Sequence, residues 1–112
     1  MLNPIAGRVE RYMDLLSARQ KLTASNIANA DTPGFKTKDV DFEGELHSAA
    51  STGTAPRVSE VQGLPLKNDG NNISIDREAR NLAENSLRFH IATQFLQSQI
   101  RLTRDAIQEG RQ

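Results

Sequence analysis

The stretch "ASNIANADTPGFK", Ala24 to Lys36, decides the fold because it ends one segment of the chain and starts another. Thr32 precedes Pro33, and the residue before a proline is disfavoured in helical backbone. Pro33 and Gly34 suit the two central positions of a type II turn, since proline fixes the first φ and glycine accepts the positive φ of the second. We therefore predict that a helix ends before Thr32 and that a turn then redirects the chain.

The residues before this stretch predict a long helix. Asn3 can cap it, and Pro4 fits a first turn in which the missing N–H is not needed. Apolar residues then recur broadly on one side of a helix with a period of about 3.6 residues. They are Ile5, Val9, Tyr12, Leu15, Leu16, Leu22 and Ile27. The predicted helix runs from about Pro4 to about Ala28.

The end of this helix combines small side chains with two amides. The small residues are Ala24, Ser25, Ala28 and Ala30. They would let another helix backbone approach closely, and Asn26 and Asn29 could bond across that contact or to carbonyls freed at the helix end. Because a buried unpaired amide costs about 1–3 kcal/mol, we expect Asn26 and Asn29 to specify packing register. The alternative is an ordinary capped helix end, and both descriptions can hold together.

A second, longer helix is predicted from Arg77 to Glu109. Asp76 can cap it, Glu78 adds negative charge to its first turn, and Gly110 lies where a stop is expected. At about 1.5 Å per residue this helix would be close to 50 Å long.

Two apolar rows run along this second helix. The first has the alternating steps of three and four that are typical of a coiled-coil seam, and we expect its pairing residues to be Leu82, Phe89, Leu96 and Ile100. The second row contains Leu87, Ile91 and Phe95. Ile91 lies about 200° around the helix from Phe89, so one partner helix cannot cover both rows.

The first helix is the only internal candidate partner, so we expect the second row to face neighbouring chains in an oligomer. The alternative is that the middle segment, residues 37–75, folds back over this row. Most of that segment is rich in Ser, Thr, Gly, Asn and Pro, which predicts extended or irregular structure and no third helix. Within it, "KDVDFEGEL" alternates apolar and acidic residues, which predicts a short strand or extended arm.

Composition excludes several classes of function. Lys plus Arg and Asp plus Glu both number 14, so no general positive field attracts nucleic acid. Cysteine is absent, which excludes thiolate metal sites and cysteine nucleophiles. No apolar run approaches the roughly 20 residues of a membrane span, and the charged N-terminal residues do not resemble a secretory signal.

Sequence motifs also predict no cofactor, no metal site and no enzyme. Asp39, Asp41, Glu43 and Gly44 are similar to the start of a calcium loop, but the twelfth position is Ala50 rather than a carboxylate. His47 and His90 have no nearby grouping that suggests a catalytic relay.

The quoted stretch "ASNIANADTPGFK" resembles the N-terminal signature of the flagellar axial protein family, which includes rod, hook and hook-associated subunits. The signature includes Pro33, Gly34 and Phe35. Two further stretches, "DTPGFKTKDVDF" (31–42) and "NDGNNISIDREARNLAENSLRF" (68–89), are more similar to proximal rod subunits than to other members.

The resemblance implies a mainly α-helical fold in which the long terminal helices pair as an antiparallel coiled coil. Segments 1–36, 37–75 and 76–112 would then form one domain. It also implies a structural subunit of the proximal rod of the basal body, in the periplasm, that packs with its own copies and with other rod proteins and transmits torque. Further implied partners are the membrane-embedded ring, the small adaptor FliE and the flagellar type III export apparatus. The alternative is a small soluble helical adaptor or export-associated protein that does not polymerise.

Overall fold

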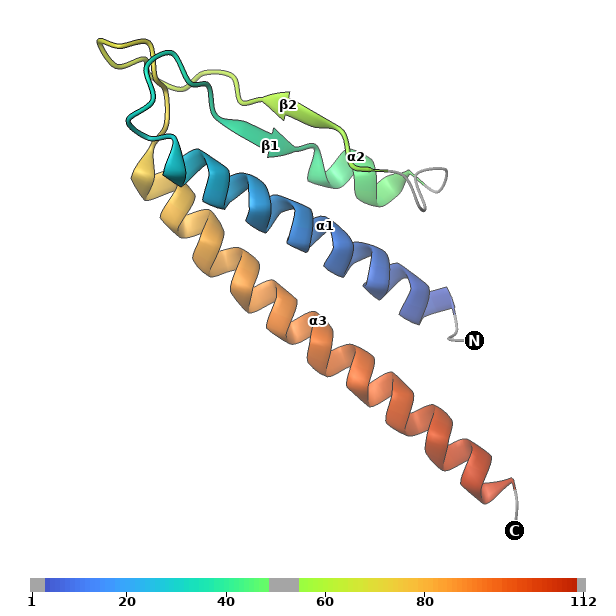
Figure 1. Cartoon of the computed structure of the whole chain (residues 1–112). Helices are drawn as coiled ribbons and strands as arrows, with labels where there is room; N and C mark the ends of the chain where they lie inside the picture. The colour runs from blue at the N-terminus through green and yellow to red at the C-terminus, as the bar shows by residue number, and fades with distance from the viewer. Residues whose placement is uncertain (1–3, 49–54, 111–112) are drawn as a thin grey trace.

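The computed structural model describes residues 4–48 and 55–110. Two long helices, α1 (Pro4–Ala28) and α3 (Ile75–Glu109), lie side by side and run in opposite directions (Figure 1). The short elements β1 (Lys38–Val40), α2 (Phe42–His47) and β2 (Val58–Glu60) lie along α1, so α1 contacts α3, β1 and α2. The predicted antiparallel pair of terminal helices is confirmed.

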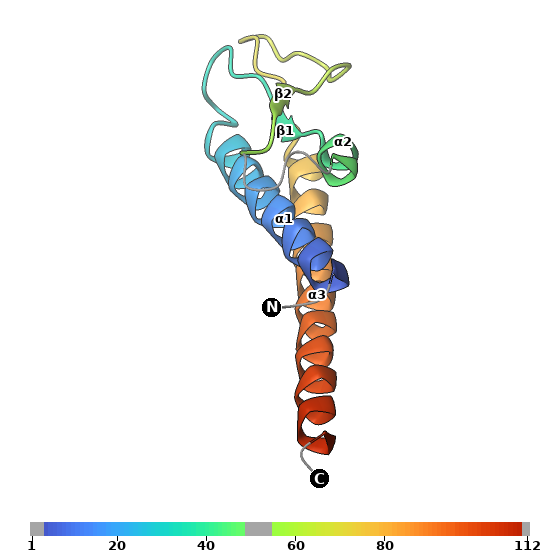
Figure 2. The same cartoon turned by 90° about the vertical axis from the view of Figure 1, so that its right-hand side faces the viewer.

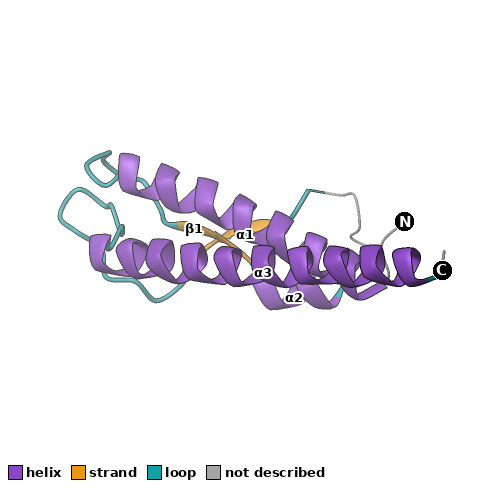
Figure 3. Cartoon of the chain, turned by 90° about the horizontal axis from the view of Figure 1, so that it is seen from below, coloured by secondary structure: helices purple, strands orange, loops and turns teal. Residues whose placement is uncertain are grey.

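The molecule is elongated, with extents of 70 × 27 × 17 Å. Helix α1 crosses α3 at an angle, and the C-terminal part of α3 continues well beyond the N-terminus of α1 (Figure 1, Figure 2). Helices make up most of the described chain (Figure 3). We call the segment of α3 from residue 97 to residue 109 the overhang.

The predicted first helix and turn are confirmed. Helix α1 has the predicted bounds, and its predicted cap, Asn3, lies outside the described residues. The Phe35 N–H donates to the Thr32 carbonyl over 3.2 Å, and Gly34 has a φ of 75°. This positive φ is the conformation that the third position of a type II turn requires, and glycine adopts it without strain.

Helix α3 begins two residues earlier than predicted, and Asp76 is not its cap. Ser74 is the N-cap, because its hydroxyl accepts from the Arg77 N–H over 3.2 Å. Asp76 instead lies in the first turn, where its negative charge still favours the helix N-terminus. The helix ends at Glu109 as predicted, followed by Gly110.

The middle segment contains a short third helix, so the expectation of no helix there is wrong. The Asp41 side chain accepts from the Gly44 N–H over 3.2 Å and caps α2. The alternation in "KDVDFEGEL" therefore spans two elements, and only Lys38–Val40 is a strand. That strand pairs antiparallel with β2, with Asp39 opposite Ser59.

Few apolar side chains are buried in the described chain. The core consists of Ala6, Leu15, Leu16, Val40, Ile73 and Ala92. Leu87, Ile91 and Phe95 are 60%, 56% and 41% exposed, so the described middle segment does not fold over the second apolar row.

An ion-pair cluster fastens α2 to its surroundings. Glu45 is 2% exposed, and its carboxylate lies 3.2 Å from Arg11 of α1 and 3.0 Å from Arg57, just before β2. The Arg57 N–H also donates to Glu45 over 2.9 Å. Hydrogen bonds from the Arg57 backbone and guanidinium lower the pKa of Glu45 from its ordinary value of 4.5, with a further contribution from the charge of Arg11.

We predict that Glu45 stabilises the fold in a pH-dependent way. Because the pKa of Glu45 is lowered on folding, its contribution is present above about pH 4.5 and is lost as the pH falls through the folded-state pKa. Urea unfolding should therefore show that Glu45→Gln destabilises the protein at pH 7 and that the difference from the unmodified protein shrinks at low pH. The control is Glu43→Gln on the exposed side of the same helix. A difference that stays constant with pH would contradict the prediction.

Candidate functional site

The loop before α3 is bound to the turn after α1 by buried amides. Asn71 is fully buried, and its Nδ2 donates to the carbonyls of Asn29 (2.9 Å) and Thr32 (2.8 Å). Its Oδ1 accepts from the Ile73 N–H over 2.8 Å. One side chain therefore satisfies backbone groups on both sides of the helix junction.

Asn72 extends the same connection to the start of β1. Its Oδ1 accepts from the N–H and the hydroxyl of Thr37, over 2.7 and 2.8 Å. The Asn72 N–H donates to the Phe35 carbonyl over 3.3 Å. The two stretches that are similar to proximal rod subunits, 31–42 and 68–89, are therefore packed together in space.

Asn26 joins three elements. Its side chain is 1% exposed and pairs with both backbone groups of Lys38 in β1: Oδ1 accepts from the N–H over 3.2 Å, and Nδ2 donates to the carbonyl over 2.9 Å. Nδ2 also donates to the carboxylate of Glu78 in α3. The predicted contact of Asn26 across a helix boundary is thus made within one chain, and its role in register between subunits stays a prediction.

A chain of ion pairs links Glu78 of α3 to β1 and then to α1. Arg77 donates to Glu78 over 2.8 Å and to Asp39 over 3.1 Å. Arg19 of α1 lies 3.4 Å from the same Asp39 carboxylate. Glu78 is fully buried, and a buried carboxylate is tolerated only when it is paired and hydrogen-bonded in this way.

The other residues singled out in the first helix and turn have local roles. Asn29 donates to the Ser25 carbonyl over 2.8 Å and accepts from the Thr32 hydroxyl over 3.0 Å, which caps the helix end. Pro33 is exposed in the turn, and Phe35 is half-buried with Lys38 Nζ 5.6 Å from its ring centre. Ala24, Ser25 and Ala28 are exposed, and α3 packs against a different side of α1.

The side of α3 that is buried against α1 is mostly polar. Its buried residues are Glu78, Asn85 and Ala92, one heptad apart. Asn85 Nδ2 donates to the Leu16 carbonyl over 2.7 Å and to Gln20 over 3.1 Å, so the contact includes a side chain bound to the backbone of the other helix. Glu78 and Asn85 were not predicted as packing residues, because polar side chains on a helix usually face solvent.

The two predicted apolar rows flank this polar line. Phe89 and Phe95, three residues before and after Ala92, lie about 60° to either side of it at about 100° per residue. They are 39% and 41% exposed. Of the other predicted pairing residues, Leu82 and Leu96 are half-buried and Ile100 is 39% exposed. The assignment of these residues as a seam stays a prediction.

Each row borders a groove between the two helices. The Phe89 groove has a volume of about 410 Å³ and is bordered on the α1 side by Leu16, Ser17 and Gln20. The Ile91 groove has a volume of about 280 Å³, with Ile91 and Phe95 on one side and Val9 and Tyr12 on the other. The helix pair therefore presents two half-covered apolar surfaces.

The chain is similar to proteins of the bacterial flagellum. Residues 13–36 match a family model described as "Flagella basal body rod protein". The flagellar basal body rod protein FlgB of Borrelia hermsii is 37% identical, over 74% of this chain and 80% of the relative. FlgB of Yersinia enterocolitica is 30% identical, over 98% and 100% of the two chains, and FlgB of Escherichia coli is 30% identical, over 90% and 91%.

These matches and the pair of long helices define the class, a rod protein of the flagellar basal body. Within that class the chain belongs to the FlgB family. This family is structural, so the prediction of a non-enzymatic protein is confirmed. No helix within residues 4–48 and 55–110 is long and apolar enough to cross a membrane.

We predict that Asn26→Asp destabilises the isolated chain strongly. Asparagine donates to Glu78, whereas aspartate would place a second carboxylate against it in a buried site. The expected loss is about 3 kcal/mol in the free energy of unfolding at pH 7, measured by urea denaturation.

Asn29→Asp is the matched control, because Asn29 lies in the same helix end and its amide bonds are exposed. It should cost clearly less than Asn26→Asp. Equal losses for the two variants would contradict the role of Asn26 as a buried junction.

Proposed function

We propose that this protein is a structural subunit of the proximal flagellar rod that joins its neighbours through the two apolar rows of α3. The observation that carries the proposal is the exposure of Leu87 and Ile91, at 60% and 56%, on a long helix of a rod protein family member. An apolar surface several turns long is covered in a stable protein. The buried residues of α3 are Glu78, Asn85 and Ala92, and the pairing with α1 leaves Leu87 and Ile91 more than half exposed.

The polar contacts within the helix pair suit a part that transmits torque. Sliding α1 along α3 would break the bonds from Asn26 to Glu78 and from Asn85 to Leu16, and would leave buried polar groups without partners. Apolar contacts alone would resist such sliding less, because they are not directional. The subunit can then pass force along its axis with its two helices held in register.

The rod neighbours follow from family membership, and we propose four kinds. They are further copies of this chain, other rod proteins, the membrane-embedded ring and the adaptor FliE. We further propose that the flagellar type III export apparatus delivers the chain to a rod in the periplasm. Support comes from the rod protein family and from the unpartnered α3 surface, which has room for neighbours on both sides.

We predict that Leu87→Ser/Ile91→Ser separates folding from assembly. Both side chains are more than half exposed, so the thermal midpoint and helicity of the isolated chain should change little, within about 0.5 kcal/mol per residue. The amount of the variant in purified basal bodies, and the motility of cells that make only the variant, should fall sharply.

Ala83→Ser is the matched control, since Ala83 is exposed on the same helix, lies outside the overhang and lines neither groove. It should leave both incorporation and motility unchanged. Normal incorporation of the double variant would rule out this surface as the contact with rod neighbours.

A further inference from the structure

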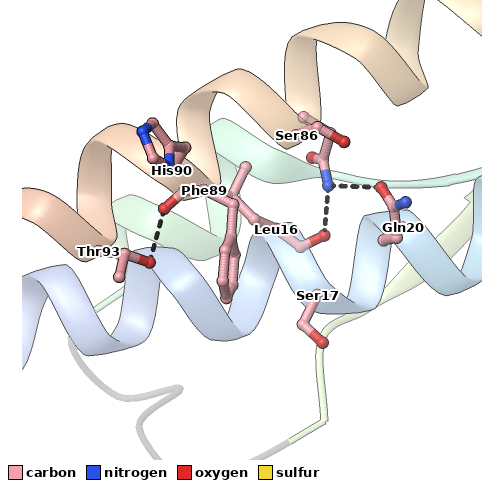
Figure 4. Close-up of a pocket in the computed structure, with 8 residues that line it drawn as sticks. Leu16, Ser17, Gln20, Ser86, Phe89, His90 and Thr93 are labelled. Atoms are coloured by element: carbon pink, nitrogen blue, oxygen red, sulfur yellow. Dashed lines mark hydrogen bonds between the residues drawn. The ribbon is translucent and has the colours of Figure 1, made fainter.

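The Phe89 groove has an apolar wall. Phe89 extends from α3 toward α1, and Leu16 and Ser17 lie opposite on α1 (Figure 4). Ser86 and Thr93 border the groove on α3, and the Thr93 hydroxyl is already bound to the Phe89 carbonyl of its own helix over 2.9 Å. No Asp, Glu, Lys or Arg is among the described residues that line this groove.

One buried polar atom in this groove has no partner. Asn85 is 4% exposed, and its Nδ2 is bound to Leu16 and Gln20, but its Oδ1 accepts no hydrogen bond within the described chain. A buried acceptor without a donor costs about 1–3 kcal/mol. A partner that enters the groove with an N–H or O–H group would remove this cost. An occupant of the groove must therefore meet two requirements: apolar side chains that pack on the wall, and a hydrogen-bond donor for Asn85.

The overhang of α3 meets both requirements. Residues 101–109 are exposed throughout, and Ile107 is 54% exposed, so this helix end has no partner helix in the described chain. Ile100 and Ile107 lie one heptad apart with Arg104 between them, which places two apolar side chains and a guanidinium donor along one side.

Charge favours the Phe89 groove over the Ile91 groove for this occupant. Arg88 lines the Ile91 groove and is paired with Glu84 over 2.5 Å, so it would place a like charge beside Arg104. The lining of the Phe89 groove contains no such like charge. On α1, exposed Asp14 lies three residues before Ser17 and exposed Lys21 four residues after it, so the two charges at the rim offset each other.

We propose that the Phe89 groove binds the α3 overhang of a second copy of this chain, with Arg104 of that copy donating to Asn85 Oδ1. The proposal rests on the proposed function and specifies which surfaces of two rod subunits meet. Because the overhang and the groove are different surfaces, the contact is heterologous and leaves one overhang and one groove free. Repetition then builds a head-to-tail stack along the helix axis rather than a closed dimer.

Disulfide formation in assembled rods tests the contact, since the chain contains no cysteine of its own. The variant is Ser17→Cys/Thr103→Cys, which keeps Arg104 and places the second cysteine beside it; it is made as the only copy in the cell, and purified basal bodies are oxidised and run on a non-reducing gel. Ser17 lines the groove with Phe89, and Thr103 is about 21 Å further along α3, beyond the roughly 7 Å that a disulfide spans, so any bond joins two copies.

We expect dimers and a ladder of longer disulfide-linked species that collapses on reduction. The matched control is Arg88→Cys/Thr103→Cys, which carries the same overhang cysteine and places the other in the Ile91 groove. It should give no ladder, and neither should the two variants with a single cysteine.

Three results would overturn the inference. Basal bodies that contain the double variant but form no linked species would refute the contact and leave the rod function intact. A ladder from the control pair, with none from the Ser17 pair, would show that the overhang binds the Ile91 groove instead of the Phe89 groove. Absence of the unmodified chain from basal bodies would instead refute the proposed function and this inference with it.

Discussion

The arrangement of the whole molecule depends on one buried amide, that of Asn26. It closes the free backbone edge of β1 at Lys38 and reaches the carboxylate of Glu78 at the start of α3. Three segments far apart in the sequence therefore share a single side chain, and none of them can shift without leaving a polar group buried and unpaired. Asn71 and Asn72 repeat the principle at the adjacent turn. Hydrogen bonds, rather than an apolar core, fix the angle at which the two long helices leave this junction.

The same preference for polar contacts explains the surface of the protein. Because Glu78 and Asn85 occupy the line that faces α1, the large apolar side chains of α3 lie to either side of the contact. An ordinary two-helix pair would place those side chains at its centre and present a polar exterior. Here polar residues lie at the centre of the helix contact and apolar residues lie outside it. The isolated subunit therefore has a specific internal geometry but leaves much of its apolar surface exposed. Both properties suit a part that functions within an assembly.

Local signals in the sequence predicted the long helices well, whereas the contacts between segments could not be predicted. The bounds of α1 and the turn at Gly34 follow from Pro4, Pro33 and Gly34, whose effects act within a few residues. The exposure of the Ile91 row also followed from periodicity. The burial of Glu78 and Asn85 did not, because each depends on a partner 52 or 69 residues away, Asn26 and Leu16. The cap of α2 by Asp41 was missed since an alternating apolar pattern was also compatible with a strand.

The small number of buried apolar side chains has a consequence for how the protein reaches its site. With six such residues in the described part of the chain, folding alone gains little free energy, so little work is needed to pull the chain open. If delivery proceeds through a narrow conduit, the subunit can be drawn through as an extended thread without a powerful unfoldase. At the growing tip the neighbouring chains would then cover Leu87 and Ile91, and the stability that the lone chain lacks would appear only where the chain is incorporated. Such a subunit unfolds readily before assembly and is stabilised by its neighbours after assembly.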